Sequence, residues 1–285
     1  MSAYRFCRSD DIRLLVNALN RCWSPYFPDE PPVTPEAFKR SIRDLQVWCS
    51  SSMVAFSGSD PIGVLIGAKR PSGTLVHRIA VHPDHRRQGH GRHLLASLGS
   101  KLAILGPPRI VTEVPETLAS ACELFSASGY IQEALLTDYE LRNEALDGGD
   151  VTGRFVITVT IDDLAANDLL EGAHSQTGWE HAVETLTAKK DDIAGLAVAS
   201  DERIEAYLLY VKPGMEEAEI LSLCSLIDDG GARLKQLLAQ LRARGIRSLR
   251  FPKVHPEEIS AELLETLGFR PVSAHRLYTT RARPQ

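Results

Sequence analysis

One segment of the 285-residue chain combines residue types that suit phosphate binding. Residues 79–95, with sequence IAVHPDHRRQGHGRHLL, lead from an apolar run through a loop with two glycines and three arginines into a helical pattern of leucines. Backbone N–H groups at a helix start lack internal partners, and glycines let an anion approach the main chain closely. Because Arg86, Arg87 and Arg92 can add charge-assisted contacts, we expect a diphosphate ligand rather than a carboxylate.

The glycine spacing separates this loop from two other phosphate-binding motifs. The chain has no G-x-x-x-x-G-K-[ST] segment, and its glycines do not fit G-x-G-x-x-G. Residues 86–91, RRQGHG, fit R/Q-x-x-G-x-G/A instead. With the preceding IAVHP, the segment resembles the acetyl-CoA-binding motif of the GCN5-related N-acetyltransferase (GNAT) superfamily. The run IAVHPDHRRQGHGR is especially similar to the corresponding segment of ribosomal-protein N-terminal acetyltransferases.

This resemblance implies a co-substrate, acetyl-CoA, and a role for each part of the motif. The main chain at Ile79 and Val81 would contact the pantetheine arm and the thioester, and the Val81 N–H would polarise the thioester carbonyl. The following loop would hold the pyrophosphate while an acceptor amine attacks the thioester directly. The implied cofactor-binding residues are Ile79, Ala80, Val81, Arg86, Arg87, Gln88, Gly89, His90, Gly91 and Arg92.

The sequence departs from the family pattern at the expected proton donor. Family members often have a tyrosine four residues before the glycine of G-F/Y, but Phe125 stands there, and Leu118 replaces the usual asparagine. We name three other candidates for catalysis. His77 is either a general base or a structural histidine near the sheet edge. Glu113, at the end of a strand, is either a catalytic polar group or a solvated side chain. Tyr139 either caps the cleft or only packs.

The loop WSPYFPDEPP at residues 23–32 is the candidate acceptor site. It follows the first predicted helix, where the superfamily usually places acceptor-binding residues. Tyr26 and Phe27 would line a pocket, and Asp29 and Glu30 would attract a positive amine; alternatively, the loop packs only on its own aromatics. We therefore expect an N-acetyltransferase for a small-molecule primary amine. The alternatives are a protein N-terminal or lysine acetyltransferase, and a non-catalytic acyl-CoA-binding or interaction protein.

The histidines and cysteines predict neither a metal site nor a disulfide framework. His82, His85, His90 and His93 straddle a loop and a helix start without a fixed orienting partner, so we expect no metal. The five cysteines are scattered, and none is spaced C-x-x-C. They are expected to be small buried residues in a reducing compartment.

The surrounding elements predict an α/β fold with a mixed central sheet, built twice as two tandem GNAT folds. The segment NEALDGGD at residues 143–150 reads as a linker between a GNAT domain at 1–142 and a second domain at 151–285. SASGYI at 126–131 matches ETLGFR at 265–270, which indicates an internal duplication. At the position of the phosphate loop, the second copy has Asp228 and Asp229 in place of arginines, so we expect a degenerate copy without cofactor.

Element boundaries follow from periodicity and turn residues. Ser9 is the expected N-cap of the first helix, and Thr34 and Pro35 predict the start of a second helix. Five leucines from Leu94 to Leu105 share one face of a later helix. The first half is expected to finish with two short strands near Ile131 and Tyr139.

The net charge of the chain bears on whether it binds nucleic acid or membranes. Lys plus Arg gives 32 and Asp plus Glu gives 37, so the net charge of 32 − 37 = −5 offers no general basic field for nucleic acid or an anionic membrane. The charged start of the chain does not resemble a signal peptide, and no apolar run is long enough to span a membrane. We expect a cytoplasmic protein, either a monomer that is a pseudo-dimer of its two domains or a homodimer.

Overall fold

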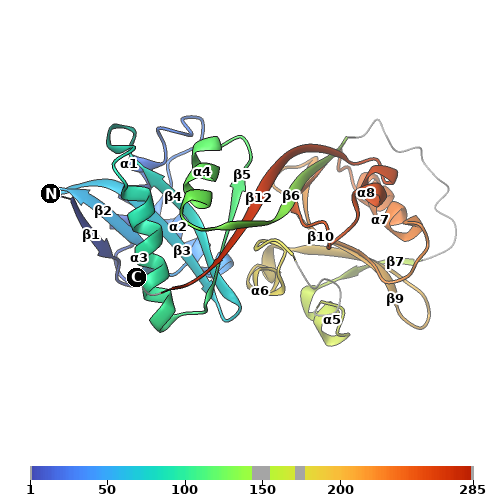
Figure 1. Ribbon diagram of the computed structural model, residues 1–285. Helices are drawn as coiled ribbons and strands as arrows, with labels where there is room; N and C mark the ends of the chain where they lie inside the picture. The colour runs from blue at the N-terminus through green and yellow to red at the C-terminus, as the bar shows by residue number, and fades with distance from the viewer. Residues whose placement is uncertain (1, 143–154, 171–176, 284–285) are drawn as a thin grey trace. The chain divides into compact units, whose positions relative to one another are not determined.

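The computed structural model describes residues 2–142, 155–170 and 177–283 (Figure 1). The linker expected at residues 143–150 lies outside the described residues. The chain divides into two compact units. Unit 1 consists of Met1–Glu133 together with Arg276–Gln285, and unit 2 consists of Ala134–His275.

The sheet of unit 1 is mixed, as predicted. The first four strands pair antiparallel with one another, and the fourth and fifth strands pair in parallel. The order is β1-β2-β3-β4-β5-β12, with β1 at Ser2–Phe6, β2 at Met53–Ser57, β3 at Asp60–Arg70, β4 at Gly73–Val81, β5 at Arg109–Pro115 and β12 at Arg270–Arg281.

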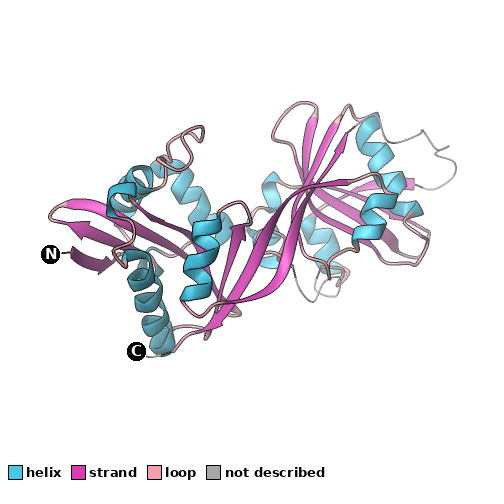
Figure 2. Ribbon diagram, turned by 45° about the horizontal axis from the view of Figure 1, so that its top comes forward, coloured by secondary structure: helices cyan, strands magenta, loops and turns pink. Residues whose placement is uncertain are grey.

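Helices cover both faces of this sheet (Figures 1 and 2). One face carries α1 at Ile12–Cys22 and α2 at Pro35–Leu45, and the other carries α3 at His90–Leu105 and α4 at Ala119–Ala127. The Thr34 hydroxyl accepts from the Ala37 N–H at 3.1 Å and confirms the predicted cap of α2. The Ser9 cap is wrong, because α1 starts after Asp11.

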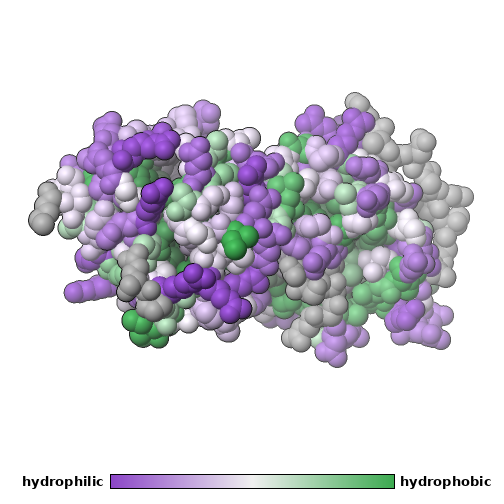
Figure 3. Space-filling view, viewed as in Figure 1, coloured by the Kyte–Doolittle hydropathy of each residue, from purple (hydrophilic) through white to green (hydrophobic). Residues whose placement is uncertain are grey.

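The core of unit 1 joins α3 and α4 to the strands. Leu94, Leu95, Leu98 and Leu102 are buried there, as the periodicity predicts. Leu105 is different: it is 67% exposed at the end of α3, where Figure 3 shows an apolar patch. All five cysteines are buried and unbridged, as expected.

Unit 2 has the strand order β6-β11-β10-β9-β8-β7. Instead of the two short strands expected, β6 is one strand that pairs antiparallel with β11. The helix α6 was not predicted from the sequence. The strands are β6 at Ile131–Arg142, β7 at Phe155–Val159, β8 at Ala194–Ala199, β9 at Ile204–Val211, β10 at Glu217–Ser225 and β11 at Ser248–Val254. The helices are α5 at Ile161–Ala166, α6 at Val183–Ala188, α7 at Ala232–Ala243 and α8 at Ala261–Thr266.

Two strands pass from one unit to the other. The first residues of β6 belong to unit 1 and the rest to unit 2, whereas β12 begins in unit 2 and ends in unit 1. Tyr278 of β12 is 3% exposed in the core of unit 1, and the Ala282 N–H donates to the Pro108 carbonyl at 2.6 Å. The end of the chain therefore completes unit 1.

The two units share two local structural features, a β-bulge and a helix that begins after a glycine. Each contains a bulge at the fifth residue of the corresponding strand, His77 in β4 and Leu221 in β10. Each also has a helix that begins after a glycine with positive φ, Gly89 at +85° before α3 and Gly231 at +83° before α7. These shared features fit the internal duplication expected from the sequence.

Candidate active site

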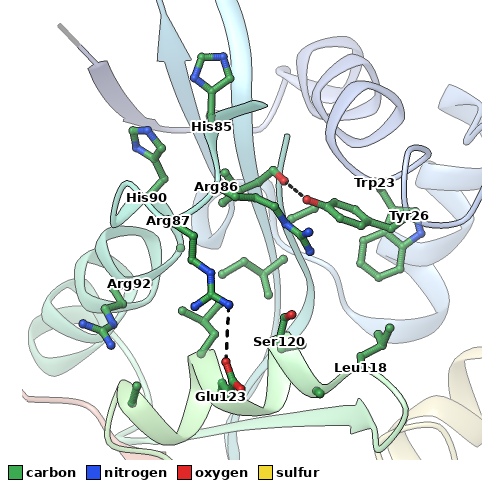
Figure 4. A pocket seen from close by; sticks show the side chains of 18 of the residues that line it. Trp23, Tyr26, His85, Arg86, Arg87, His90, Arg92, Leu118, Ser120 and Glu123 are labelled. Carbon is green, nitrogen blue, oxygen red and sulfur yellow. Dashed lines mark hydrogen bonds and ion pairs between the residues drawn. The ribbon is translucent and has the colours of Figure 1, made fainter. Parts of the chain in front are cut away.

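A cavity of about 940 Å³ opens in unit 1 at the end of β4 (Figure 4). One wall is the β4 segment from Ile79 to Val81, and another is the loop that runs into α3. The segment from Thr117 to Ala127 lines the opposite side, and Trp23, Tyr26 and Phe27 line one end. The loop at residues 86–92, here called the glycine-arginine loop, and the loop at residues 23–32, here called the aromatic loop, are far apart in sequence but border one cavity.

The cavity exists because β4 and β5 separate. The described ladder between them pairs only Thr74 with Ile110 and Leu75 with Val111. At the point of separation the Thr112 hydroxyl donates to the Val76 carbonyl at 3.0 Å. The rest of β4 therefore has β3 on one side and the cavity on the other.

The backbone of β4 presents hydrogen-bonding groups to this space. The His82 N–H donates to the Ile62 carbonyl of β3 at 2.9 Å. Because antiparallel pairs alternate in the direction of their N–H and C=O groups, the main-chain groups of Val81 and Ile79 point away from β3. Consistent with this direction, the Val81 carbonyl accepts a hydrogen bond from the Tyr26 hydroxyl at 2.6 Å.

The end of the cavity at the start of α3 has the features of an anion-binding site. Gly89 is the N-cap of α3, so the free N–H groups of the first helical turn begin there. Arg86, Arg87 and Arg92 all line the cavity. Arg87 approaches Glu123 at 3.8 Å, but both side chains are largely exposed, so this ion pair is weak.

Three other residues of the glycine-arginine loop differ in their contacts with the cavity. A Cβ at Gly91 would lie 3.1 Å from the Leu124 side chain, so this glycine permits α3 to pack against α4. His90 lines the cavity, but its ring bonds to the Tyr4 hydroxyl at 2.6 Å, and burial, with His85 and His93 nearby, lowers its pKa. Gln88 is exposed and is not among the lining residues.

The aromatic loop closes the end of the cavity beyond Val81. The Arg86 guanidinium lies 4.6 Å from the centre of the Tyr26 ring (Figure 4). The rings of Trp23 and Phe27 stack with their centres 4.6 Å apart. Burial raises the pKa of the Tyr26 phenol, and the charge of Arg86 acts against this shift. Asp29 and Glu30 are exposed and do not line the cavity; Glu30 accepts from the Trp23 Nε1–H at 3.1 Å.

The three residues named for catalysis lie outside the set that lines the cavity. His77 is the extra residue of the β4 bulge, and Glu113 is half-buried on β5. Tyr139 is 7% exposed in the core of unit 2, and burial raises its pKa. Phe125 packs in the core of unit 1, against Tyr130 and Tyr278.

Sequence reasoning missed most of the wall formed by α4 and the residues before it. Besides Leu118, which stands where the family usually has an asparagine, this wall includes Thr117, Ser120 and Ala121. The available signal is a run of small residues, TLASA at 117–121, opposite the end of β4. Small side chains leave room between two strands that have separated.

The described residues contain no group of three or more His, Cys, Asp or Glu side chains placed to hold a metal ion. Of the helices in the described part of the chain, none is long and apolar enough to cross a bilayer.

Comparison with known proteins agrees with this site. Residues 12–130, which contain the glycine-arginine loop and the whole cavity lining, match the model of the acetyltransferase (GNAT) family. Members of this family generally use acetyl-CoA. A search of the curated proteins finds no match to the chain.

Solved structures share the fold over the whole chain. A tandem GNAT protein from the clavulanic acid biosynthesis pathway, solved without AcCoA, has a TM-score of 0.67 at 18% identity, with 100% of both chains covered. A GCN5-related N-acetyltransferase from Sphaerobacter thermophilus has a TM-score of 0.68 at 15% identity, with 99% of this chain and 96% of that chain covered. A glucosamine N-acetyltransferase region of a fungal multi-domain GH3 β-N-acetylglucosaminidase has a TM-score of 0.73 at 13% identity, with 98% of this chain and 38% of that chain covered.

The family match of residues 12–130 supports an acyltransferase. The chain is a tandem GNAT-fold protein, and residues 12–130 of its first unit match the GNAT acetyltransferase family. The predicted resemblance of the first unit to this family, the mixed sheet and the two tandem folds are confirmed.

Proposed function

We propose that the protein binds one acetyl-CoA per chain, in the cavity of unit 1, and transfers the acetyl group to the primary amine of a small molecule. The observation that carries this proposal is the single space that joins the free edge of β4 to the start of α3. An extended thiol-bearing arm needs the first surface, and a pyrophosphate needs the second.

The residues of the site fit the requirements of direct attack. The N–H groups of Ile79 and Val81 are aimed into the cavity and can stabilise the negative charge that develops on a thioester oxygen. The Gly89 loop and its arginines hold the diphosphate. Acetyl-CoA, when bound, supplies the activated acyl group.

Tyr26 is the proposed proton donor to the departing thiolate. The amine loses one proton as its N–C bond forms and the C–S bond breaks, and that proton returns to the Tyr26 phenolate through solvent. The Tyr26 hydroxyl is held at the carbonyl of Val81, the residue whose N–H would face the thioester. Burial raises its pKa, so the phenol keeps its proton at neutral pH. This assignment replaces the tyrosine that the family often has at the position of Phe125.

Unit 2 is proposed to bind no acyl-CoA, because its own carboxylate takes the anion position. Asp229 accepts from the Gly231 N–H at 3.0 Å and from the Arg233 N–H at 2.9 Å. These donors belong to the start of α7, which corresponds to the start of α3 in unit 1. The Arg233 guanidinium in turn bonds to Glu205 at 2.9 Å.

Calorimetry and a thiol-release assay test the function together. We expect one acetyl-CoA site per chain and amine-dependent release of CoA with a panel of small primary amines. Two equivalent sites would contradict the role given to Asp229. Turnover only with peptides would favour a protein acetyltransferase, and binding without any turnover would favour a non-catalytic acyl-CoA-binding protein.

The variant Tyr26→Phe tests the proton donor. The kcat should fall about 100-fold, as for loss of a general acid, while the acetyl-CoA Kd stays within about twofold. Phe125→Tyr, made alone, is the matched control and should not change kcat, because position 125 lies in the core. An unchanged kcat in Tyr26→Phe would leave water as the proton source.

A further inference from the structure

One cationic side chain beside the acceptor end of the cavity has no function in the scheme above. Arg78 of β4 is half-buried, and its guanidinium lies 5.1 Å from the centre of the Trp23 ring. Within the part of the chain that the structure describes, no carboxylate lies at ion-pair distance from it. Burial lowers the pKa of Arg78, and the charge of Glu30 only partly opposes that shift.

The β4 bulge decides which face of the sheet carries Arg78. The register pairs Gly67 with Val76 and Ile66 with Arg78, so His77 is an extra residue. Val76 and Ile79 consequently share the face that packs on α3 and α4. In a regular strand Arg78 would share that apolar face with Val76, but the bulge turns it to the opposite face, where Trp23 follows α1.

This position is next to the reacting end of the cavity. Ile79, the following residue, presents its main chain to the cavity, and Trp23 lines the cavity as well. Trp23 also donates its Nε1–H to Glu30, so one indole contacts a guanidinium and a carboxylate. Through Trp23, a positive and a negative group therefore lie near the aromatic end of the cavity, although neither Arg78 nor Glu30 is among the residues that line it.

We propose that Arg78 binds a carboxylate of the acceptor, so that the substrate is an amine that also carries a carboxylate, as an amino acid does. The proposal rests on the function proposed above. A half-buried arginine gains most from a planar anion that accepts from its N–H groups in pairs. One guanidinium matches the single charge of a carboxylate, whereas a phosphate dianion would leave excess negative charge near Glu30.

Matched acceptors test this inference. L-amino acids are compared with their carboxamides, with the corresponding decarboxylated amines and with O-phosphoethanolamine, at saturating acetyl-CoA. We expect kcat/KM for the best amino acid to exceed that of its carboxamide and of its decarboxylated amine by about tenfold or more, as for a charge-assisted hydrogen-bonded pair. Equal rates, or a preference for O-phosphoethanolamine, would overturn the proposal.

Variants at position 78 separate binding from structure. Arg78→Gln should raise KM for the amino acid about tenfold, leave KM for its carboxamide unchanged and leave the acetyl-CoA Kd unchanged; Arg78→Lys should restore part of the loss. Arg13→Gln, an exposed arginine of α1, is the control for the charge change and should have no effect. If the KM values for both acceptors rise together in Arg78→Gln, the side chain only supports the aromatic loop.

Two outcomes tell this inference apart from the function on which it rests. Failure of acetyl-CoA to bind the wild-type chain would refute the proposed function rather than the role of Arg78. If acetyl-CoA binds without turnover, ligand-observed NMR of the amino acid and its carboxamide with the CoA-bound protein supplies the readout. Equal binding of the two would then exclude a carboxylate subsite.

Discussion

Gly89 shows how one backbone position can control cofactor binding. It lines the cavity with a φ of +85°, and no described heavy atom lies within 4 Å of the place where a Cβ would stand. A side chain there would enter the ligand's space and strain the backbone. Gly89→Val should therefore weaken acetyl-CoA binding at least about tenfold by calorimetry, because a strain of about 1–3 kcal/mol is added to the steric conflict.

Gly99 offers the matched control within the same helix. A Cβ at Gly99 also meets nothing within 4 Å, but this residue lies inside α3, away from the cavity lining. Gly99→Ala should raise stability by about 0.5–1 kcal/mol and leave the acetyl-CoA Kd unchanged. Equal loss of binding in Gly89→Val and Gly99→Ala would show that the effect of Gly89→Val does not come from the phosphate site.

Asp138 makes the stability of unit 2 sensitive to acid. Burial alone would raise its pKa, but hydrogen bonds from His275, Ser273 and the Lys253 N–H outweigh burial and hold the pKa at about 2, below the ordinary 3.8. Because the folded-state pKa is lowered, the ionised carboxylate stabilises the fold above pH 3.8. That contribution, about 2 kcal/mol, is lost as the pH falls from about 4 to about 2.

Denaturant titration of Asp138→Asn and wild type across pH measures this contribution. The variant should be less stable by about 2 kcal/mol at pH 7, and the difference should shrink as the pH falls below 3.8. Asp201→Asn, in the exposed turn between β8 and β9, is the control. A difference that stays constant down to pH 2 would mean that lost packing, not the charge, explains the effect.

The start of α7 illustrates how an element is stabilised when it binds no ligand. Asp229 satisfies two N–H groups there and is held by Arg233 at 3.6 Å. Asp229→Ala should lower the stability of unit 2 by about 1–2 kcal/mol in chemical denaturation, because these donors lose their acceptor and the helix start loses a negative charge. Asp228→Ala removes the same charge from an exposed neighbour and should change stability by less than about 0.5 kcal/mol.

Across the molecule, unit 1 depends on the last residues of the chain. Tyr278 stacks on Phe125 with ring centres 6.1 Å apart, and the Thr280 hydroxyl donates to the Gly129 carbonyl at 3.2 Å. Tyr278→Ala should destabilise unit 1 by about 3–5 kcal/mol, as for other buried aromatic truncations. Thermal unfolding and acetyl-CoA binding, measured on the full chain, should both be impaired.

A control variant and a fragment test whether unit 1 needs Tyr278. Arg281→Ala changes an exposed residue of the same strand and should leave both measurements unchanged. A fragment of residues 1–142 lacks Tyr278 and should aggregate or bind acetyl-CoA poorly, because its core is open. A soluble fragment with full binding would show that unit 1 does not need the end of the chain.

Local signals in the sequence were sufficient for the phosphate loop and for most elements. The glycine-arginine loop, the start of α3 and the cap of α2 at Thr34 depend on residues within a few positions of one another. Hydrophobic periodicity likewise located the strands that border the cavity, since alternation along a strand needs no distant partner. The family resemblance and the duplicated order of elements followed from these signals.

Tertiary structure alone decided the features that depend on distant pairing. The separation of β4 from β5, the bulge that turns Arg78 toward Trp23 and the passage of β12 into unit 1 all follow from contacts between segments many residues apart. For the same reason Tyr139, which lies on a strand near the end of the first sequence half, packs in the core of unit 2. A strand's own residues specify its alternation, but its register and its neighbours are chosen by the partner strands, which the local sequence does not contain.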